Sequence, residues 1–395
     1  MTTPTAAKTP SYVLPLLVLS TLMASSVWFA ANAVIPALTA EIGQTISAGD
    51  ITTAVQFGFI VGTFTFAGLA LADRFSPCRV FLVSCVFAGL CNMGVALMPD
   101  SGIAVLAARF GVGFFLAGIY PVAMKIAFSW YPKGLGIALG FLVGALVLGT
   151  AFPHLVRALG QDFSWRLVIY ITSGAAVIGG LVVGILLGDG PNRGKPGALH
   201  PLALIDAFRQ PDFRASASGY FGHMWELYTF WAFVPLWLGA YATQHQLADF
   251  DISLWSFWII AAGALGCVGG GLITPKCGPA RVAGVQLFIS GMLCLVSPLL
   301  FLLPPAAFLL VLLIWGVTVA GDSPQFSTLN ALNAPSHLAG SALTIVNCIG
   351  FTISIISLQV VEALLPLLAT EWLFFVLVPG PLLGLISFRR LLHSS

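Results

Sequence analysis

Twelve apolar runs, each close to twenty residues long, fill most of this 395-residue sequence. A helix needs about 20 predominantly apolar residues to cross the hydrocarbon core of a bilayer. Only 8% of the residues are charged, whereas soluble domains carry roughly 25%. The sequence therefore predicts an all-α polytopic membrane protein with twelve transmembrane helices, near residues 12–36, 51–72, 80–97, 103–128, 135–159, 167–187, 215–241, 252–273, 282–303, 306–329, 338–364 and 367–388.

One long polar interruption, rich in Gly, Pro and charge, lies at the middle of the chain. It predicts two six-helix bundles, 1–187 and 214–395, joined by a cytoplasmic linker at 188–213. Within the linker, 200–209 has the spacing of a short amphipathic helix that lies on the membrane surface.

The placement of basic residues predicts the orientation. Of 16 Lys and Arg residues, 12 fall in the termini, the linker and the loops on the same side, and only Arg157 and Arg166 fall in the opposite loops. Cytoplasmic loops carry the excess of Lys and Arg in membrane proteins. We therefore expect the protein in the inner (cytoplasmic) membrane, with both termini in the cytoplasm.

The net charge and the scattered basic residues limit the classes of partner that the protein can bind. A net charge of +2, with scattered basic residues, gives no field that would attract nucleic acid. We expect a monomer in the lipid bilayer that handles a small-molecule substrate together with protons or another coupling ion, without a cofactor or a metal.

A weak internal repeat relates the two halves. Matched positions recur at offsets of 202 or 203 residues, and two such halves build a cavity at their interface in secondary transporters that work by alternating access. The matched pairs are Gly68 and Gly270, Arg74 and Lys276, Arg79 and Arg281, Gly118 and Gly321, Pro121 and Pro324, and Pro132 and Pro335.

The loop 68–79 resembles the cytoplasmic signature of the major facilitator superfamily, Gly-x-x-x-Asp-Arg-x-Gly-Arg-Arg/Lys. Asp73 and Arg74 match it, whereas Ser76-Pro77-Cys78 departs from it. The resemblance implies a transporter, not an enzyme, with the two-bundle fold of that family.

The same loop predicts a gate. Asp73 follows a helix end, where it can pair with Arg74 or Arg79 and cap a neighbouring helix. In the second copy, Lys276 and Arg281 are retained but the acid is replaced by proline. A plain positive-inside loop is the alternative interpretation.

Four ionisable side chains besides histidines fall inside the predicted spans: Arg109, Lys125, Glu226 and Asp322. Each is a functional candidate, because a charge within the membrane costs at least a few kcal/mol. Arg109-x-x-x-Gly113 resembles a pattern of the superfamily's fourth helix that serves substrate binding or proton coupling. Alternatively, Arg109 extends outward to the membrane surface or bonds backbone carbonyls. Lys125 either reaches the interface or lines the cavity.

Glu226 and His223 are three residues apart and share a helix face. Because desolvation among aromatic side chains disfavours a charged carboxyl, we predict that Glu226 carries protons with His223 beside it. The alternatives are a structural hydrogen bond between the two residues and a contact with a substrate cation. Asp322 lies between Gly321 and Pro324, which loosen the helix, and is predicted both to couple protons and to bind substrate.

The first, fourth, seventh and tenth helices line the cavity in this superfamily. The resemblance therefore implies a substrate site, suited to an amphipathic organic solute or an organic anion, made by Trp28, Asn32, Arg109, Trp225, Tyr228 and Asp322.

The sequence is compatible with several classes of substrate. The fifth span lacks the Gly-Pro pair of drug/proton antiporters, which weakens multidrug efflux. The stretch 118–155 is similar to bacterial nitrate and cyanate permeases, but the second and eighth spans lack the arginine that nitrate carriers place there. We predict proton-coupled transport of a small, organic solute. Multidrug efflux, small-anion permeation and, more remotely, a membrane receptor are the alternatives.

Overall fold

The structure, a computed structural model, describes residues 10–43, 46–131, 135–192, 203–335 and 338–393, and these residues form helices without any strand. Ten helical segments among them are long and apolar enough to cross a membrane. Two further crossings are the first, formed by α1 (Val13–Ser25), η1 (Asn32–Val34) and α2 (Ile35–Ile42), and the seventh, formed by α11 (Pro211–Gln244). The predicted twelve-helix, all-α membrane fold is confirmed.

The other helices of the first half follow the predicted spans, with short helices added at their ends. They are α3 (Ala48–Gly68), α4 (Leu71–Arg74), α5 (Pro77–Leu97), α6 (Gly102–Leu116), α7 (Tyr120–Trp130), α8 (Leu135–Leu159) and α9 (Arg166–Leu186). The second half contains α10 (Ala203–Arg209), α12 (Ile252–Cys277), α13 (Pro279–Leu300), α14 (Pro305–Gly321), α15 (Ser323–Asn333), α16 (Ala339–Leu364), η2 (Thr370–Leu377) and α17 (Pro379–His393).

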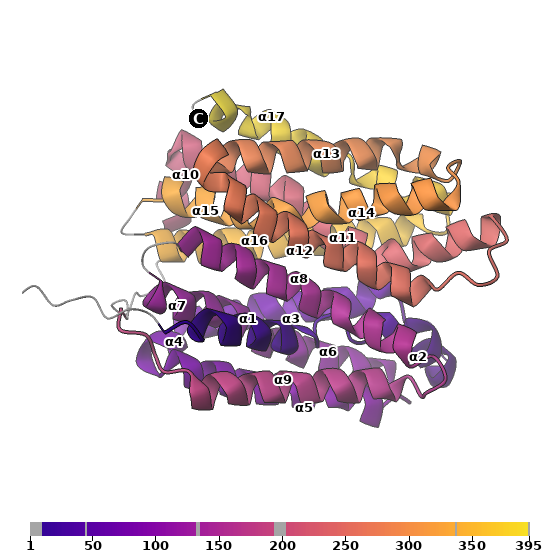
Figure 1. Cartoon of the computed structure of the whole chain (residues 1–395), viewed down its shortest axis with the longest axis horizontal. Coiled ribbons are helices and arrows are strands. Elements are labelled where there is room, and N and C mark those ends of the chain that lie inside the picture. The colour runs from indigo at the N-terminus through magenta and orange to yellow at the C-terminus, as the bar shows by residue number, and fades with distance from the viewer. Residues whose placement is uncertain (1–9, 44–45, 132–134, 193–202, 336–337, 394–395) are drawn as a thin grey trace, which may run out of the picture.

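The two halves lie side by side, with α1–α9 in one and α10–α17 in the other (Figure 1). We call the face at which α1 begins and α17 ends the linker face, because α10 lies there, and we call the other the opposite face. Helix α10 overlaps the amphipathic helix predicted at 200–209; residues 193–202 lie outside the described residues.

The repeat is visible in the helix bounds. Helices α6 and α14 begin at Gly102 and Pro305, and α7 and α15 end at Trp130 and Asn333. Both pairs are 203 residues apart, which is the offset found in the sequence. Each of these crossings is broken in its linker-face half, and the following helix carries a proline in its first turn, where no backbone N–H is needed.

Helices α8 and α12 pack along the boundary between the halves. A Cβ atom on Gly140 would lie 3.2 Å from the carbonyl oxygen of Cys267, and one on Gly144 would lie 3.2 Å from Val268 Cγ2. Glycine therefore allows the close approach of the two helices. The boundary continues on the other side of the molecule through α3 and α16.

Candidate functional site

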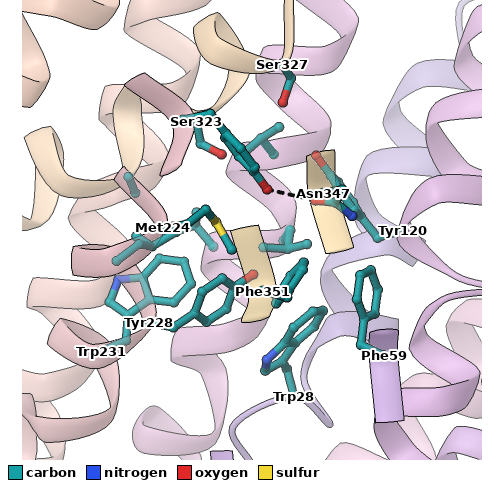
Figure 2. Close-up of a pocket in the computed structure, with 16 residues that line it drawn as sticks. Trp28, Phe59, Tyr120, Met224, Tyr228, Trp231, Ser323, Ser327, Asn347 and Phe351 are labelled. Atoms are coloured by element: carbon teal, nitrogen blue, oxygen red, sulfur yellow. Dashed lines mark hydrogen bonds between the residues drawn. The ribbon is translucent and has the colours of Figure 1, made fainter. Parts of the chain in front are cut away.

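A small cavity lies between the halves, at the level of the broken first crossing. Its volume is about 50 Å³, whereas pockets that hold drug-sized ligands reach roughly 300–1,000 Å³. The cavity is therefore too small in this conformation to hold a ligand of that size. Figure 2 shows the side chains around it, which are Trp28, Phe59, Tyr120, Val143, Leu146, Val147, Tyr220, Met224, Leu227, Tyr228, Trp231, Ala320, Ser323, Ser327, Asn347 and Phe351.

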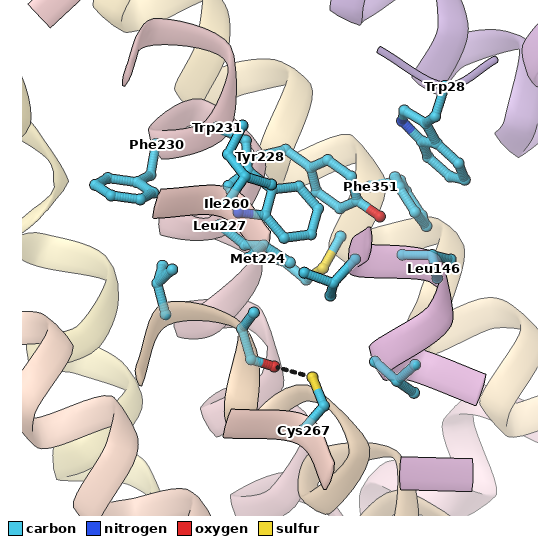
Figure 3. Close-up of a cluster of buried hydrophobic side chains, with 14 of the residues drawn as sticks. Trp28, Leu146, Met224, Leu227, Tyr228, Phe230, Trp231, Ile260, Cys267 and Phe351 are labelled. Atoms are coloured by element: carbon cyan, nitrogen blue, oxygen red, sulfur yellow. Dashed lines mark hydrogen bonds between the residues drawn. The ribbon is translucent and has the colours of Figure 1, made fainter. Parts of the chain in front are cut away.

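Aromatic rings from both halves form one side of this cavity. Trp28 stacks on Tyr228 and on Phe351, with ring centroids 5.6 Å and 5.8 Å apart. Tyr228 in turn meets Trp231 edge-on at 5.3 Å. Figure 3 shows Trp28 facing these rings across the boundary. Offset and edge-on pairs of this kind are favourable contacts, and they hold the two halves together here.

Hydroxyl and amide groups gather at the other side of the cavity. Tyr220 Oη donates a hydrogen bond of 2.8 Å to Asn347 Oδ1. Ser323 and Ser327 lie one turn apart on α15, and Tyr120 begins α7. The described residues of the lining include no Asp, Glu, Lys, Arg or His. The cavity can therefore offer aromatic faces and neutral hydrogen-bonding groups to a ligand.

Hydrogen bonds between the halves close the opposite face. Glu362 Oε2 accepts a bond of 3.3 Å from the Gly49 N–H, and Gln359 donates to Thr53 at 3.0 Å. Two further bonds join Gln56 to Ser354 at 3.0 Å and Gln161 to Asp251 at 2.7 Å. All four lie on the opposite-face side of the cavity, so a path to the cavity must open either there, by breaking them, or from the linker face.

Arg109 is fully buried and does not line the cavity. Its guanidinium donates to the Val27 carbonyl at 2.9 Å, to the Trp28 carbonyl, and to Asn92 Oδ1 at 2.9 Å. These two carbonyls belong to residues 26–31, where the first crossing is not helical. The structure thus realises the alternative in which Arg109 bonds backbone carbonyls.

Asn92 extends this buried polar cluster to α9. Its Nδ2 donates to Thr172 Oγ1 at 3.0 Å and to Ser173 Oγ at 2.9 Å. Ser26 Oγ also donates to the Thr172 carbonyl at 3.2 Å. The broken segment that carries Trp28 is therefore held from α5, α6 and α9.

Two other residues of the predicted substrate site also lie outside the cavity lining. Asn32 donates to Thr52 Oγ1 at 2.8 Å. Trp225 packs against Gly380 of the last crossing. Of the predicted substrate residues, the structure brings only Trp28 and Tyr228 to the cavity wall.

Asp322 and His223 form a buried pair directly behind the wall. His223 Nδ1 lies 2.8 Å from Asp322 Oδ1, and the two side chains are 0% and 1% exposed. Asp322 occupies the break between α14 and α15, and its neighbour Ser323 lines the cavity. A favourable contact between these two atoms needs a proton on one of them.

Glu226 lies in a separate buried site. Its Oε1 accepts from Ser290 Oγ, from Trp315 Nε1 at 2.9 Å and from Cys294 Sγ at 3.4 Å. These donors come from α13 and α14, so Glu226 connects three helices of the second half. Glu226 and His223 share a helix face, but their side chains have different partners, because His223 contacts Asp322.

The predicted gate residues lie at the linker face, but Asp73 has a different partner. It pairs with Lys125 of α7, and neither Arg74 nor Arg79 is its partner. The prediction that Asp73 caps the next helix is wrong. The N-cap residue of α5 is Ser76, which accepts from the Arg79 N–H at 3.3 Å, and Asp189 accepts from the Cys78 N–H at 3.2 Å.

The other predicted gate residues are placed as follows. Arg74 ends α4, and Arg79 lies in the first turn of α5 beside a second cavity. Lys276 and Arg281 lie on either side of the turn between α12 and α13. Helix α12 continues through Pro275, so the second half has no counterpart of α4.

Several cavity residues were not predicted: Phe59, Tyr120, Tyr220, Asn347, Phe351, Ser323 and Ser327. Asn347 could have been identified from the sequence, because it is an amide side chain inside an otherwise apolar run. No group of three His, Cys, Asp or Glu side chains within the described ranges could hold a metal ion.

Comparison with known proteins gives the family. The sequence profile of the Major Facilitator Superfamily matches residues 17–358. An uncharacterized 38 kDa protein in the 23S RNA operon of Thermoproteus tenax is 31% identical over 258 residues, which are 63% of each chain. Because the profile covers most of the chain, including both halves and the broken crossings, this protein belongs to the major facilitator superfamily of membrane transporters.

Proposed function

We propose that the protein is a proton-coupled secondary transporter of a small organic solute, and that the cavity between its halves is the solute site. The observation that carries this proposal is the juxtaposition of an aromatic cavity with the buried His223–Asp322 pair, 2.8 Å apart, behind its wall. In the proposed alternating access, residues 1–187 and 214–395 rock as two bundles on the linker 188–213.

The lining favours an uncharged or amphipathic solute over an inorganic anion. Arg109, the positive charge that sequence reasoning assigned to an anion, is engaged by three acceptors of the protein itself. Trp28 and Trp231 line the cavity, and their buried indole N–H groups have no partner among the described residues. A solute with an apolar body and acceptor oxygens would satisfy such donors.

The cavity has to widen for such a solute. A cavity of about 50 Å³ has room for a few water molecules at most. The hydrogen bonds at the opposite face would persist in the state open to the linker face, which is the cytoplasmic side in the predicted orientation, and would break in the other state.

Proton coupling is assigned first to the His223–Asp322 pair and second to Glu226. Asp322 lies at a helix break beside Ser323, so a change in its protonation is transmitted directly to the cavity wall. Glu226 is held by three donors within the second half, and its proton would change the packing of α11 against α13 and α14.

Multidrug efflux is the second candidate, because an uncharged aromatic lining also accepts apolar drugs. The direction of transport separates the two candidates: uptake of a metabolite supports the first, and extrusion of several unrelated drugs supports the second.

A thermal-shift screen of the purified protein against metabolites and drugs, at pH 6 and pH 8, tests the solute site. Compounds that raise the melting temperature are then titrated against Trp28→Phe and Trp225→Phe. We expect weaker binding only in Trp28→Phe, because Trp225 packs against the last crossing, outside the cavity lining. Equal loss in both variants, or in neither, would contradict the assigned cavity.

A further inference from the structure

A second, larger cavity opens on the outer surface of the first half, at its linker-face end. Its volume is about 400 Å³, and α3, α4, α5 and α6 contribute to it. We call it the lateral groove. It is separate from the solute cavity and shares no residue with it. It is lined by Thr65, Phe66, Leu71, Phe75, Ser76, Arg79, Val80, Val83, Ser84, Phe87, Phe114 and Phe115.

The body of the lateral groove is apolar and open to the surroundings. Val83 and Phe87 are 52% and 45% exposed. Phe87 stacks on Phe115 with ring centroids 5.0 Å apart, and Phe114 meets Phe115 edge-on at 5.2 Å. Since these residues belong to membrane-crossing helices, the groove faces lipid chains and not water.

One end of the groove is positively charged. Arg79 lines it in the first turn of α5 and is exposed, and it forms no ion pair with the other described residues. From Arg79 to Phe87 along α5 is about 12 Å at 1.5 Å per residue. This length is close to one leaflet, which is half of the roughly 30 Å hydrocarbon core.

We propose that the lateral groove binds one anionic phospholipid, with its phosphate at Arg79 and an acyl chain along Val83, Phe87 and Phe115. A guanidinium binds phosphate oxygens in a bidentate manner. The predicted orientation places this end in the cytoplasmic leaflet, where anionic lipids gather. The charged rim and the apolar body together match the two parts of a phospholipid.

Native mass spectrometry of the full-length protein in detergent, titrated with phosphatidylglycerol, tests the proposal. We expect one tightest-binding lipid, whose apparent Kd rises about tenfold or more in Arg79→Ala. Val83→Trp should have the same effect, because an indole would fill the groove. Melting temperatures confirm that each variant is folded, and Arg79→Gln replaces Arg79→Ala if the latter fails to fold.

Matched control variants distinguish a specific lipid site from non-specific attraction of lipid to the protein surface. Arg389→Ala removes an exposed positive charge at the same face, and Leu90→Trp adds an indole to an exposed position of α5 outside the groove. Both should leave the Kd within about twofold. Equal weakening by Arg389→Ala would overturn the proposal, as would equally tight binding of phosphatidylcholine. Binding of glycerol 1-phosphate as tightly as the lipid would assign a free phosphate site instead and would also overturn it.

Discussion

Removing the guanidinium of Arg109 should destabilise the protein more than it should change the affinity of the cavity for a solute. In Arg109→Met, the carbonyls of Val27 and Trp28 and the Asn92 Oδ1 atom lose their donor inside the protein. Each buried acceptor left unpaired costs about 1–3 kcal/mol. Removing the buried guanidinium offsets part of this sum, because burying a charge itself costs free energy.

We therefore expect a net loss of about 3 kcal/mol, the low end for three unpaired acceptors. Since the unfolding entropy is about 2.1 cal/mol/K per residue, or about 0.8 kcal/mol/K for a chain of 395 residues, the apparent melting temperature in detergent should fall by about 4 °C. Lys125→Met serves as the control, because its ion pair with Asp73 is partly exposed and such pairs contribute about 1 kcal/mol or less. A normal melting temperature of Arg109→Met together with weak solute binding would refute this reasoning and restore the ligand role.

Three further outcomes are expected from other contacts. The hydrogen bond from Arg166 lowers the pKa of Glu41. The ionised Glu41 side chain therefore stabilises the fold fully above the ordinary pKa of a glutamate, about 4.3. This stabilisation is lost as the pH falls through the lowered pKa. The melting-temperature difference between wild type and Glu41→Gln should thus be present at pH 7 and vanish in strong acid; a constant difference would contradict this. Gln56→Ala combined with Gln359→Ala removes two hydrogen bonds of about 0.5–1.5 kcal/mol each, so spin-label distances across the opposite face should show more of the open state, and an unchanged distribution would argue against the proposed closure. Lys125→Met should slow or abolish solute transport through the linker-face gate while solute binding persists, and normal transport would remove this ion pair from the gate.

The regular features of the fold could be predicted from the sequence. Apolar runs define the crossings because the hydrocarbon core excludes unpaired backbone groups. A loosened tenth crossing was expected at Asp322, whereas the break of the fourth crossing was not predicted, although it follows the matched Gly118 and precedes the matched Pro121. Of the six residues predicted to bind substrate, Trp28 and Tyr228 line the cavity, and their role in binding stays a prediction.

The partners of the buried charges could not be predicted in the same way. The first crossing reads as one apolar run, so nothing in it reveals the break that exposes carbonyls to Arg109. Spacing places His223 and Glu226 on one face of α11, but the neighbouring helices decide which donor or acceptor each meets. Asp322 and Ser290 are supplied by tertiary packing, far away in the sequence.

The central claim is that proton movement through the His223–Asp322 pair drives the solute across the membrane. The most direct test measures accumulation of a solute found in the thermal-shift screen by proteoliposomes with an imposed pH gradient. We predict accumulation that a protonophore abolishes and that Asp322→Asn eliminates, while equilibrium exchange of labelled solute continues in the variant. Accumulation that depends neither on the gradient nor on Asp322 would contradict the account.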